Sequence, residues 1–432
     1  MRSVFGLALI LAEVIVAGIV RCAPTTTNAA DTVSITLQQA EDQFLRNNLQ
    51  LLAGRFGIGA AQAAADQAAL WSNPNISIEQ NAYNKYTGRF LDVTKTGNTG
   101  LQLQQLILLA GKRDKQVRLA EINTAMVRET FSGTLRALRT ELRTDMFDLF
   151  YLQKSLAFYD QTLPEVRRTV AATEAIYEKR SILLAEVLRL KSLLFSLENE
   201  RLDLLNRISE KENELAVLVH DTSSTPVYYH PSFDERALDS LRYDVLSLPA
   251  ILASAAENRP DFRLAEQQVR YDAQNLALQK ALSVPDLTVG GLYSRAGSYI
   301  PDYLAVTVSI DLPIFNRNQG NIAASEQNLE ADRALREHAR IEVEKEVTDA
   351  YRKAAAVDSL YRRFDKQFTG QYQTLVDGMN ASYERRNITI IEFTDFYESY
   401  RTSMLQMYQL FNDRLDAFEA LNYAAGTTLV GP

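Results

Sequence analysis

The side chains best placed to do chemistry are two acids near the C-terminal end of the chain. Glu392 and Asp395 lie three residues apart, so in a helix their carboxylates share one face. Glu186 stands at the matching place in an earlier segment of similar sequence. Such acids act on passing cations where copies of a chain bring several of them together. The alternative is a solvated helix surface, because exposed carboxylates are common.

The sequence contains no pattern for catalysis, for a cofactor or for a structural metal site. A nucleophile elbow and a zincin motif are both missing. Zinc is disfavoured because the chain has one cysteine and three scattered histidines, His220, His230 and His338. The formal net charge of -8 leaves no basic excess for nucleic acid. We therefore predict a protein without enzymatic activity, cofactor, bound metal or nucleic-acid partner.

The N-terminal residues predict export. An apolar run from Val4 to Val20 precedes small and polar residues, which is typical of a secretory signal peptide over residues 1–30. A transmembrane anchor is disfavoured because the run is short and contains Glu13.

The only cysteine, Cys22, lies two residues after this run, and its position predicts lipidation. Arg21 does not fit that prediction, since lipoprotein signals have a small residue before the cysteine. Cleavage near Ala29 or Ala30 is the alternative.

One segment occurs twice, 206 residues apart. Residues 177–187 read YEKRSILLAEV and residues 383–393 read YERRNITIIEF. The order of elements around each copy is the same, so half of the chain is duplicated. The predicted divisions are a first repeat, a linker, a second repeat and a tail, over 31–219, 220–248, 249–423 and 424–432.

Each repeat contains two segments in which apolar and polar residues alternate. The clearest runs from Leu304 to Leu312 and has an apolar residue at every second position. About ten residues is the length that a tilted membrane strand needs. The alternative is a small soluble sheet packed on helices. The four predicted strands cover 75–86, 99–108, 286–295 and 303–312.

Two long segments of the first repeat have apolar residues every three or four positions. The pattern runs from Leu135 to Val170 and from Leu183 to Leu218, with Arg201 and Lys211 at two seam positions. This is a heptad seam. It predicts long helices that meet at a tip near residue 180, and the second repeat has a similar tip near 386.

The first long helix is predicted over about 112–179, which is on the order of 100 Å. Pro164 is expected to bend this helix without ending it, because the seam resumes after it. Shorter helices are predicted at the start of each repeat, over about 36–70 and 249–283. The first of these contains three glycines without a preceding strand, which disfavours a phosphate-binding loop.

Four strands cannot form a membrane wall alone. Each backbone group left unpaired among lipid tails costs several kcal/mol, so membrane strands must close into a barrel. Barrels made by one chain start at about eight strands. If these strands enter a membrane, several copies of the chain must contribute their strands to one shared barrel. The predicted fold class is therefore mainly α with a transmembrane β part, assembled as a ring.

Three sequence segments resemble those of a known family: the duplicated tip, LPIFNRNQGNIAASE at 312–326 and NRPDFRLAEQQV at 258–269. They resemble the TolC-like outer-membrane factors of the outer membrane efflux protein family. Their sequences are most similar to those of its heavy-metal CzcC/CusC-like branch. The resemblance covers about residues 32–425. It implies a homotrimer with a 12-stranded barrel in the outer membrane and a long α-helical coiled-coil tunnel into the periplasm. The linker 220–248 would lie midway along this tunnel, with the C-terminus.

The resemblance assigns docking of a periplasmic adaptor to the two tips. The family usually has glycine at two of these positions, where Arg180 and Arg386 stand here. We expect Asn387 to take the left-handed conformation instead. The alternative is a solvated basic turn. The predicted docking residues are Lys179, Arg180, Ser181, Ile182, Arg385, Arg386, Asn387 and Ile388.

By the same resemblance, Glu392, Asp395 and Glu186 line a periplasmic constriction. In a threefold ring, crowding of these carboxylates would concentrate cations and raise the pKa of some of them. The family often pairs an acid here with a base at the position of Ile388, which this chain lacks.

The predicted function is a passive exit duct of a tripartite efflux system that exports metal cations or small toxic compounds. Its implied partners are the adaptor, an inner-membrane RND-type transporter and outer-membrane lipid. A type I protein secretion duct is the alternative among channels. A periplasmic or cell-surface coiled-coil scaffold is the alternative outside that class.

Overall fold

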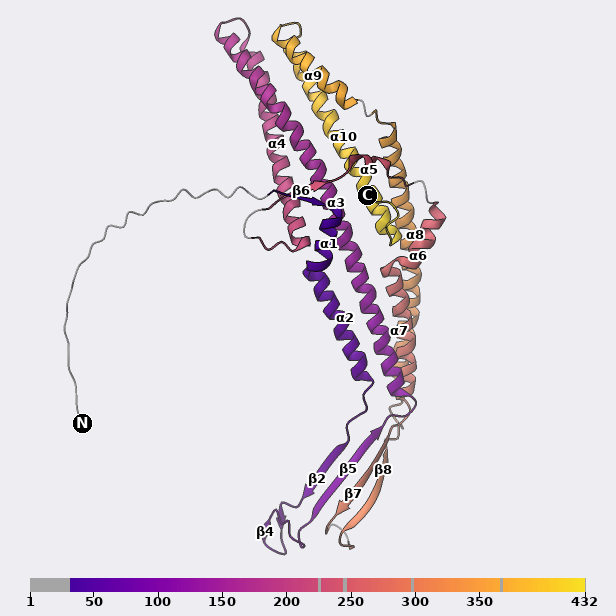
Figure 1. Ribbon diagram of the computed structural model, residues 1–432. Helices are drawn as coiled ribbons and strands as arrows, with labels where there is room; N and C mark the ends of the chain where they lie inside the picture. The colour runs from indigo at the N-terminus through magenta and orange to yellow at the C-terminus, as the bar shows by residue number, and fades with distance from the viewer. Residues whose placement is uncertain (1–31, 224–226, 244–246, 297–298, 366–367, 432) are drawn as a thin grey trace, which may run out of the picture.

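The protein is an elongated molecule with a sheet at one end and two helical tips at the other (Figure 1). The computed structural model describes residues 32–431, apart from 224–226, 244–246, 297–298 and 366–367. The predicted signal peptide and Cys22 lie outside the described residues. Among the helices described, none combines the length and apolar composition needed to cross a membrane.

The first repeat starts in the middle of the molecule, runs to the sheet and returns through two long helices (Figure 1). Thr36 begins its first helix with a capping box, in which its hydroxyl accepts from the N–H of Gln39 at 3.2 Å. The elements are β1 Thr32–Thr36, α1 Leu37–Asn47, α2 Leu49–Ala68, β2 Asn75–Gln80, β3 Tyr83–Asn84, β4 Arg89–Phe90, β5 Thr99–Ile107, α3 Lys112–Glu178 and α4 Leu184–Val219.

The helix predicted over 36–70 is in fact two helices. Asn48 has an extended backbone that ends α1, and its side-chain oxygen accepts the N–H groups of Gln50 and Leu51 at the start of α2. Its amide donates to the carbonyl of Leu218 at 3.0 Å, which anchors the break to the end of α4. A helix-capping asparagine therefore outweighs the helical propensity of its neighbours.

The strand predicted over 75–86 is too long. β2 ends at Gln80, because the following residues fold into the small β3–β4 hairpin around the buried Asp92. The carboxylate of Asp92 accepts from the Asn84 amide at 2.9 Å and from the Thr87 hydroxyl at 2.8 Å. These hydrogen bonds hold the chain away from the ladder of β5.

The second repeat follows a short linker region. In this repeat, two stretches that were expected to form single long helices are each divided into two helices. Arg259 is extended because Pro260 follows it, which divides the helix expected over 249–283. Phe364 leaves the helical conformation after α8 and its ring packs against Phe411. The elements are β6 Tyr228–Ser232, α5 Glu235–Ser240, α6 Leu248–Asn258, α7 Pro260–Leu282, β7 Leu287–Ser294, β8 Tyr303–Ile310, α8 Gln319–Arg363, α9 Phe368–Glu384 and α10 Ile390–Ala425.

α3 is one helix of 67 residues that continues through Pro164. Its apolar seam packs against α4, where side chains such as Leu190 and Leu197 are fully buried. The two basic residues in the seam of α4 are paired across the helices. Arg201 donates to Asp160, and Lys211 to Asp145, both at 2.7 Å.

The four longer strands form one antiparallel sheet in the order β2-β5-β7-β8. Paired residues share a face, and the register pairs Ile78 with Leu101, Leu101 with Tyr293, and Tyr293 with Leu304. One face is thus apolar across all four strands, whereas Ser77 pairs with Gln102 on the other.

This apolar face is open to solvent in the single chain. The side chains of Ile78, Leu304 and Val306 are 73%, 78% and 81% exposed. Within the described residues the outer edges of β2 and β8 also have no partner strand. An exposed apolar sheet with two free edges marks a surface that another phase or another chain covers.

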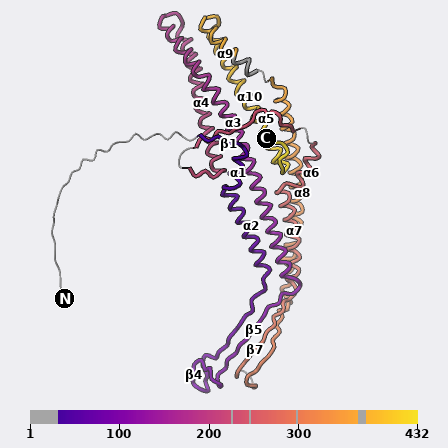
Figure 2. Tube along the Cα trace, viewed as in Figure 1, coloured from indigo at the N-terminus to yellow at the C-terminus, as the bar shows by residue number. Residues whose placement is uncertain are grey.

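The middle of the molecule is a belt formed by both repeats (Figure 2). β1 pairs in parallel with β6, so the start of the first repeat is joined to the linker. Arg414 of α10, almost fully buried, binds Asp358 of α8 at 2.7 Å and donates to the carbonyls of Leu238 and Leu241 at 2.8 and 2.6 Å. Because a buried charge requires such partners, Arg414 ties α5, α8 and α10 together.

Candidate functional site

Both helical tips have the same backbone geometry. At the end of α3, the N–H of Arg180 donates to the carbonyl of Tyr177 and the N–H of Ser181 to that of Ile176. At the end of α9, Arg386 and Asn387 make the two matching bonds to Tyr383 and Ser382. This pair of bonds defines a Schellman motif, which satisfies the last carbonyls of a helix. The duplicated sequence thus folds twice into one turn.

The two arginines themselves take the left-handed conformation. The φ angles of Arg180 and Arg386 are 55° and 58°. The expectation that Asn387 would take this place is therefore wrong. The position is fixed by the Schellman bonds, which require the left-handed residue directly after the C-cap, and that residue is arginine in both copies. Its side chain tolerates this conformation at a cost that glycine would avoid.

Replacing Arg180 and Arg386 by glycine is expected to stabilise each tip by about 1 kcal/mol, since glycine removes the left-handed penalty. Hydrogen exchange should slow about fivefold at the amides of Ser181 and Asn387, which close the two turns. Lys179→Gly is the matched control, because Lys179 has a φ of -78° and gains nothing from glycine. Unchanged exchange in the arginine variants would show that the tips carry no backbone strain.

A groove of about 330 Å³ separates the two tips. Five of the predicted tip and constriction residues line it: Ser181, Ile182, Glu186, Arg386 and Ile388. Lys179, Arg180, Arg385 and Asn387 do not line it, and they are exposed or partly exposed. The two repeats therefore present one shared recess flanked by cations.

Glu392 occupies the start of α10 and completes a capping box with Thr389. Its carboxylate accepts the N–H of Thr389 at 2.7 Å and the hydroxyl at 2.9 Å, while its own N–H donates to that hydroxyl. These bonds lower the pKa of Glu392, first through the backbone N–H of Thr389. The sequence signal Thr-x-x-Glu at 389–392 identifies this box. Glu392 thus stays ionised and held in place.

The other two predicted acids have different surroundings. Asp395 is exposed one turn along α10, and Glu186 is half-buried at the edge of the groove. Within the described part of the chain neither forms an ion pair. Leu183 stands where the second repeat has Thr389, so Glu186 has no capping partner. The duplicated acids are therefore held differently in the two repeats.

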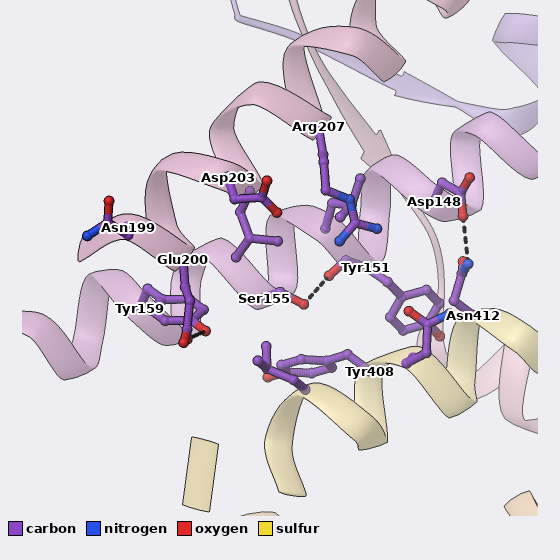
Figure 3. A pocket seen from close by; sticks show the side chains of 14 residues that line it. Asp148, Tyr151, Ser155, Tyr159, Asn199, Glu200, Asp203, Arg207, Tyr408 and Asn412 are labelled. Atoms are coloured by element: carbon purple, nitrogen blue, oxygen red, sulfur yellow. Dashed lines mark hydrogen bonds between the residues drawn. The ribbon is translucent and has the colours of Figure 1, made fainter. Parts of the chain in front are cut away.

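A second recess, of about 430 Å³, lies between α3, α4 and α10 (Figure 3). Its central contact is Glu200, which sequence reasoning missed. The Glu200 carboxylate accepts from Tyr159 at 2.6 Å and from Arg401 at 2.9 Å. This joins the first hairpin to α10. No sequence pattern marks the contact, because Glu200 and Arg401 lie about two hundred residues apart.

Two partly buried acids, Asp148 and Asp416, lie beside this recess, and Asp148 also lines it. Asp148 and Asp416 both accept from the amide of Asn412, at 2.6 and 3.0 Å, and Lys211 lies 3.3 Å from Asp148. Figure 3 shows the contact of Asp148 with Asn412. Burial, followed by the charge of Asp148, raises the pKa of Asp416 to about 7. One oxygen of Asp416 is buried without a hydrogen-bond partner among the described residues.

Asp416 should make the protein less stable as the pH rises. Its folded-state pKa of about 7 exceeds its ordinary value of 3.8, so its contribution is fully present below about pH 4 and lost by about pH 7. Asp416→Asn should be more stable at pH 8 by up to about 4 kcal/mol, since the folded-state pKa lies about three above the ordinary value and one pKa unit is about 1.4 kcal/mol.

Chemical unfolding at pH 4 and pH 8 tests this prediction, and the advantage of the variant should vanish at pH 4. Asp349→Asn on the exposed face of α8 is the control. An advantage that is equal at both pH values would contradict a titrating Asp416.

The described residues contain no group of three or more His, Cys, Asp and Glu side chains placed to hold a metal ion. The candidate site is therefore a surface defined by shape and charge. It consists of two tips of the same geometry, the groove between them, and the acids next to that groove. Chemically, it offers exposed cations and exposed carboxylates to a charged binding partner. It lies at the end of the molecule opposite the apolar sheet (Figure 1).

Comparison with known proteins gives a family match over most of the chain. The model of the outer membrane efflux protein family matches residues 41–219 and 251–427. The cobalt-zinc-cadmium resistance protein CzcC of Cupriavidus metallidurans is 21% identical over 306 residues, which cover 70% of this chain and 68% of that protein.

Solved structures share the fold. A structure of CusC, described for its folding and transmembrane channel formation, has a TM-score of 0.71 at 16% identity and covers 92% of this chain and 94% of that one. The outer membrane channel CmeC of Campylobacter jejuni has a TM-score of 0.74 at 13% identity, covering 90% and 85%. The chain belongs to the outer membrane efflux protein family and, as a member of it, is an efflux duct and not an enzyme.

Proposed function

We propose that three copies of this chain form the passive exit duct of a tripartite efflux system, with a 12-stranded barrel in the outer membrane. The observation that carries this proposal is the apolar face of the sheet with its two free edges. β2 and β8 run in opposite directions along the sheet, so β8 of one copy can pair antiparallel with β2 of the next. Closure would satisfy both edges and turn the apolar face toward lipid.

The helical part supports the same ring. Leu188, Phe195 and Leu202 stand seven residues apart on one face of α4, and they are 53%, 69% and 56% exposed. Their spacing matches a second heptad seam that the single chain leaves uncovered. A neighbouring copy would bury this seam, so the helices would line a tunnel that continues the barrel into the periplasm. A soluble scaffold does not account for an apolar sheet at the end of such helices.

The groove between the tips is the proposed docking place for a periplasmic adaptor. Residues of both tip turns line it, among them Arg386. Lys179, Arg180 and Arg385 are exposed in the same two turns. In this proposal the adaptor links the duct to an inner-membrane RND-type transporter, which supplies the energy. The duct itself holds no energy source.

The proposed cargo is metal cations or small toxic compounds, and the cation-resistance name of the CzcC relative favours metal cations. The acids Glu392, Asp395 and Glu186 would form rings at the periplasmic end that concentrate cations. Protein secretion is the alternative cargo class, and it would require this end to open much wider.

The constriction role is tested by the double variant Glu392→Gln and Asp395→Asn. Glutamine can keep the capping box with Thr389, so the helix start is preserved while the charge is removed. Single-channel conductance in planar bilayers should fall by roughly twofold at low salt, because fewer cations are concentrated at this end, and block by divalent cations should weaken. Glu398→Gln, on a neighbouring exposed part of α10, is the control. Unchanged conductance and block in an assembled duct would exclude these acids from the gate.

A further inference from the structure

The loop at the far end of the sheet, residues 81–98, has a surface that the duct function does not use. It joins β2 to β5 and carries the β3–β4 hairpin, at the end of the molecule opposite the tips (Figure 1). We call it the distal loop. Its role as described here rests on the proposed function, since it assumes that the sheet lies in a membrane.

The distal loop is organised around one acid. Asp92 is 2% exposed, and its carboxylate accepts from the Asn84 amide and from the Thr87 hydroxyl. It also accepts the backbone N–H of Thr94 at 3.0 Å. The Thr94 hydroxyl also donates to this carboxylate, and its hydrogen bond, followed by the others, holds the pKa of Asp92 well below its usual range. The loop therefore has a fixed shape with an ionised carboxylate at its centre.

Around this centre the loop turns apolar side chains outward. Leu91 adopts a φ of 45°, which is rare for a bulky residue, and its N–H is held by the carbonyl of Ala82 at 3.0 Å. Strain of this kind persists where the surrounding structure fixes it and is found at functional places. The outward side chains, between 51% and 88% exposed, are Tyr83, Tyr86, Phe90, Leu91 and Val93.

The same loop carries three exposed cations, Lys85, Arg89 and Lys95. Asp92 is the only acid between residues 81 and 98, and it is buried. None of the three cations forms an ion pair with another described residue, and Lys85 lies 5.2 Å from the centre of the Tyr86 ring. Exposed aromatic and aliphatic groups mixed with unpaired cations match the boundary of a membrane, where rings sit at headgroup level and cations meet phosphate.

We propose that the distal loop binds a lipid surface that carries anionic phosphate headgroups. Its cations contact the phosphates, and its apolar side chains enter the adjoining acyl layer beside the apolar face of β2. The exposed Ile76 and Ile78 of β2 continue that apolar surface toward the helices. The loop thereby fixes how deep the duct sits in the membrane and selects the charge of the lipid around it.

The test is native mass spectrometry of the full-length protein, purified in neutral detergent and titrated with phosphatidylglycerol or phosphatidylcholine. The wild type should bind phosphatidylglycerol at least tenfold more tightly, because each cation near an anionic surface contributes roughly a fivefold change. The triple variant Lys85→Gln, Arg89→Gln, Lys95→Gln should lose this preference. A matched triple variant at the other end, Lys179→Gln, Arg180→Gln, Arg385→Gln, should retain it.

Equal binding of both lipids by the wild type, or a preference that survives in the distal-loop variant, would overturn the proposal. A loss of the preference accompanied by dissociation of the subunits would instead assign the loop to contacts between copies, and would also overturn it. Extraction from membranes separates the two claims. A protein released without detergent contradicts the duct itself, whereas one that needs detergent but ignores lipid charge contradicts only the role of the loop.

Discussion

Replacing Arg414 by alanine is expected to destabilise the protein by about 3 kcal/mol, at the lower end of the usual cost of breaking a buried ion pair. Asp358 would stay buried with only the partly exposed Arg362 as its cation, and the carbonyls of Leu238 and Leu241 would lose their donors. Chemical unfolding followed by the helical circular-dichroism signal measures this change in detergent.

Arg167→Ala provides the control for this prediction. Arg167 pairs with Glu198 at 2.8 Å, but both side chains are largely exposed, so its loss should cost at most about 1 kcal/mol. Equal effects of the two substitutions would mean that Arg414 does not hold the middle belt together.

The second large effect is expected in the sheet. Val306→Arg places a charge on the apolar face of β8 and should cost about 2–4 kcal/mol if this face meets lipid. Thr307→Arg, one residue on, points to the opposite face, and the duct should tolerate it. Both side chains belong to the same strand of the single chain, so they differ chiefly in which face they occupy.

Recovery of the two variants from purified outer membranes, with their melting temperatures, measures the difference. The Val306 variant should be depleted and less stable, and the Thr307 variant should resemble the wild type. If both are recovered equally and melt together, the apolar face does not contact lipid.

The broad architecture could be predicted because its signals are local. Alternation with period two defined the strands, and the heptad seam defined α3 and α4, since the period of the pattern decides which face is buried. Pro164 is tolerated in α3, as the uninterrupted seam indicated. The duplication was equally visible, because residues 177–187 and 383–393 have similar sequences at a constant offset of 206.

The features that could not be predicted from the sequence are of two kinds. Asn48 and Arg259 interrupt helices that looked continuous, because single caps and a following proline outweigh average propensity. The contacts of Glu200 with Arg401, and of Arg414 with Asp358, join elements far apart in the sequence. A periodic pattern carries no information about which distant side chain completes such a pair.

The candidate site lies between these two cases. The sequence located the tips and the acids behind them. It did not predict the left-handed arginines, which depend on the hydrogen bonds of the turn. The capping box of Thr389 and Glu392 was not predicted either, although its Thr-x-x-Glu pattern stands in the sequence. That box is what holds Glu392 beside the groove.

The most direct test of the duct is the mass of the protein after extraction from outer membranes, measured by native mass spectrometry in detergent. Our account predicts a particle of three chains that needs detergent to stay in solution, because β2 and β8 of each copy find their partners in the neighbouring copies. A single chain that is soluble in plain buffer would contradict it, since its sheet edges and apolar face would then be stable in water.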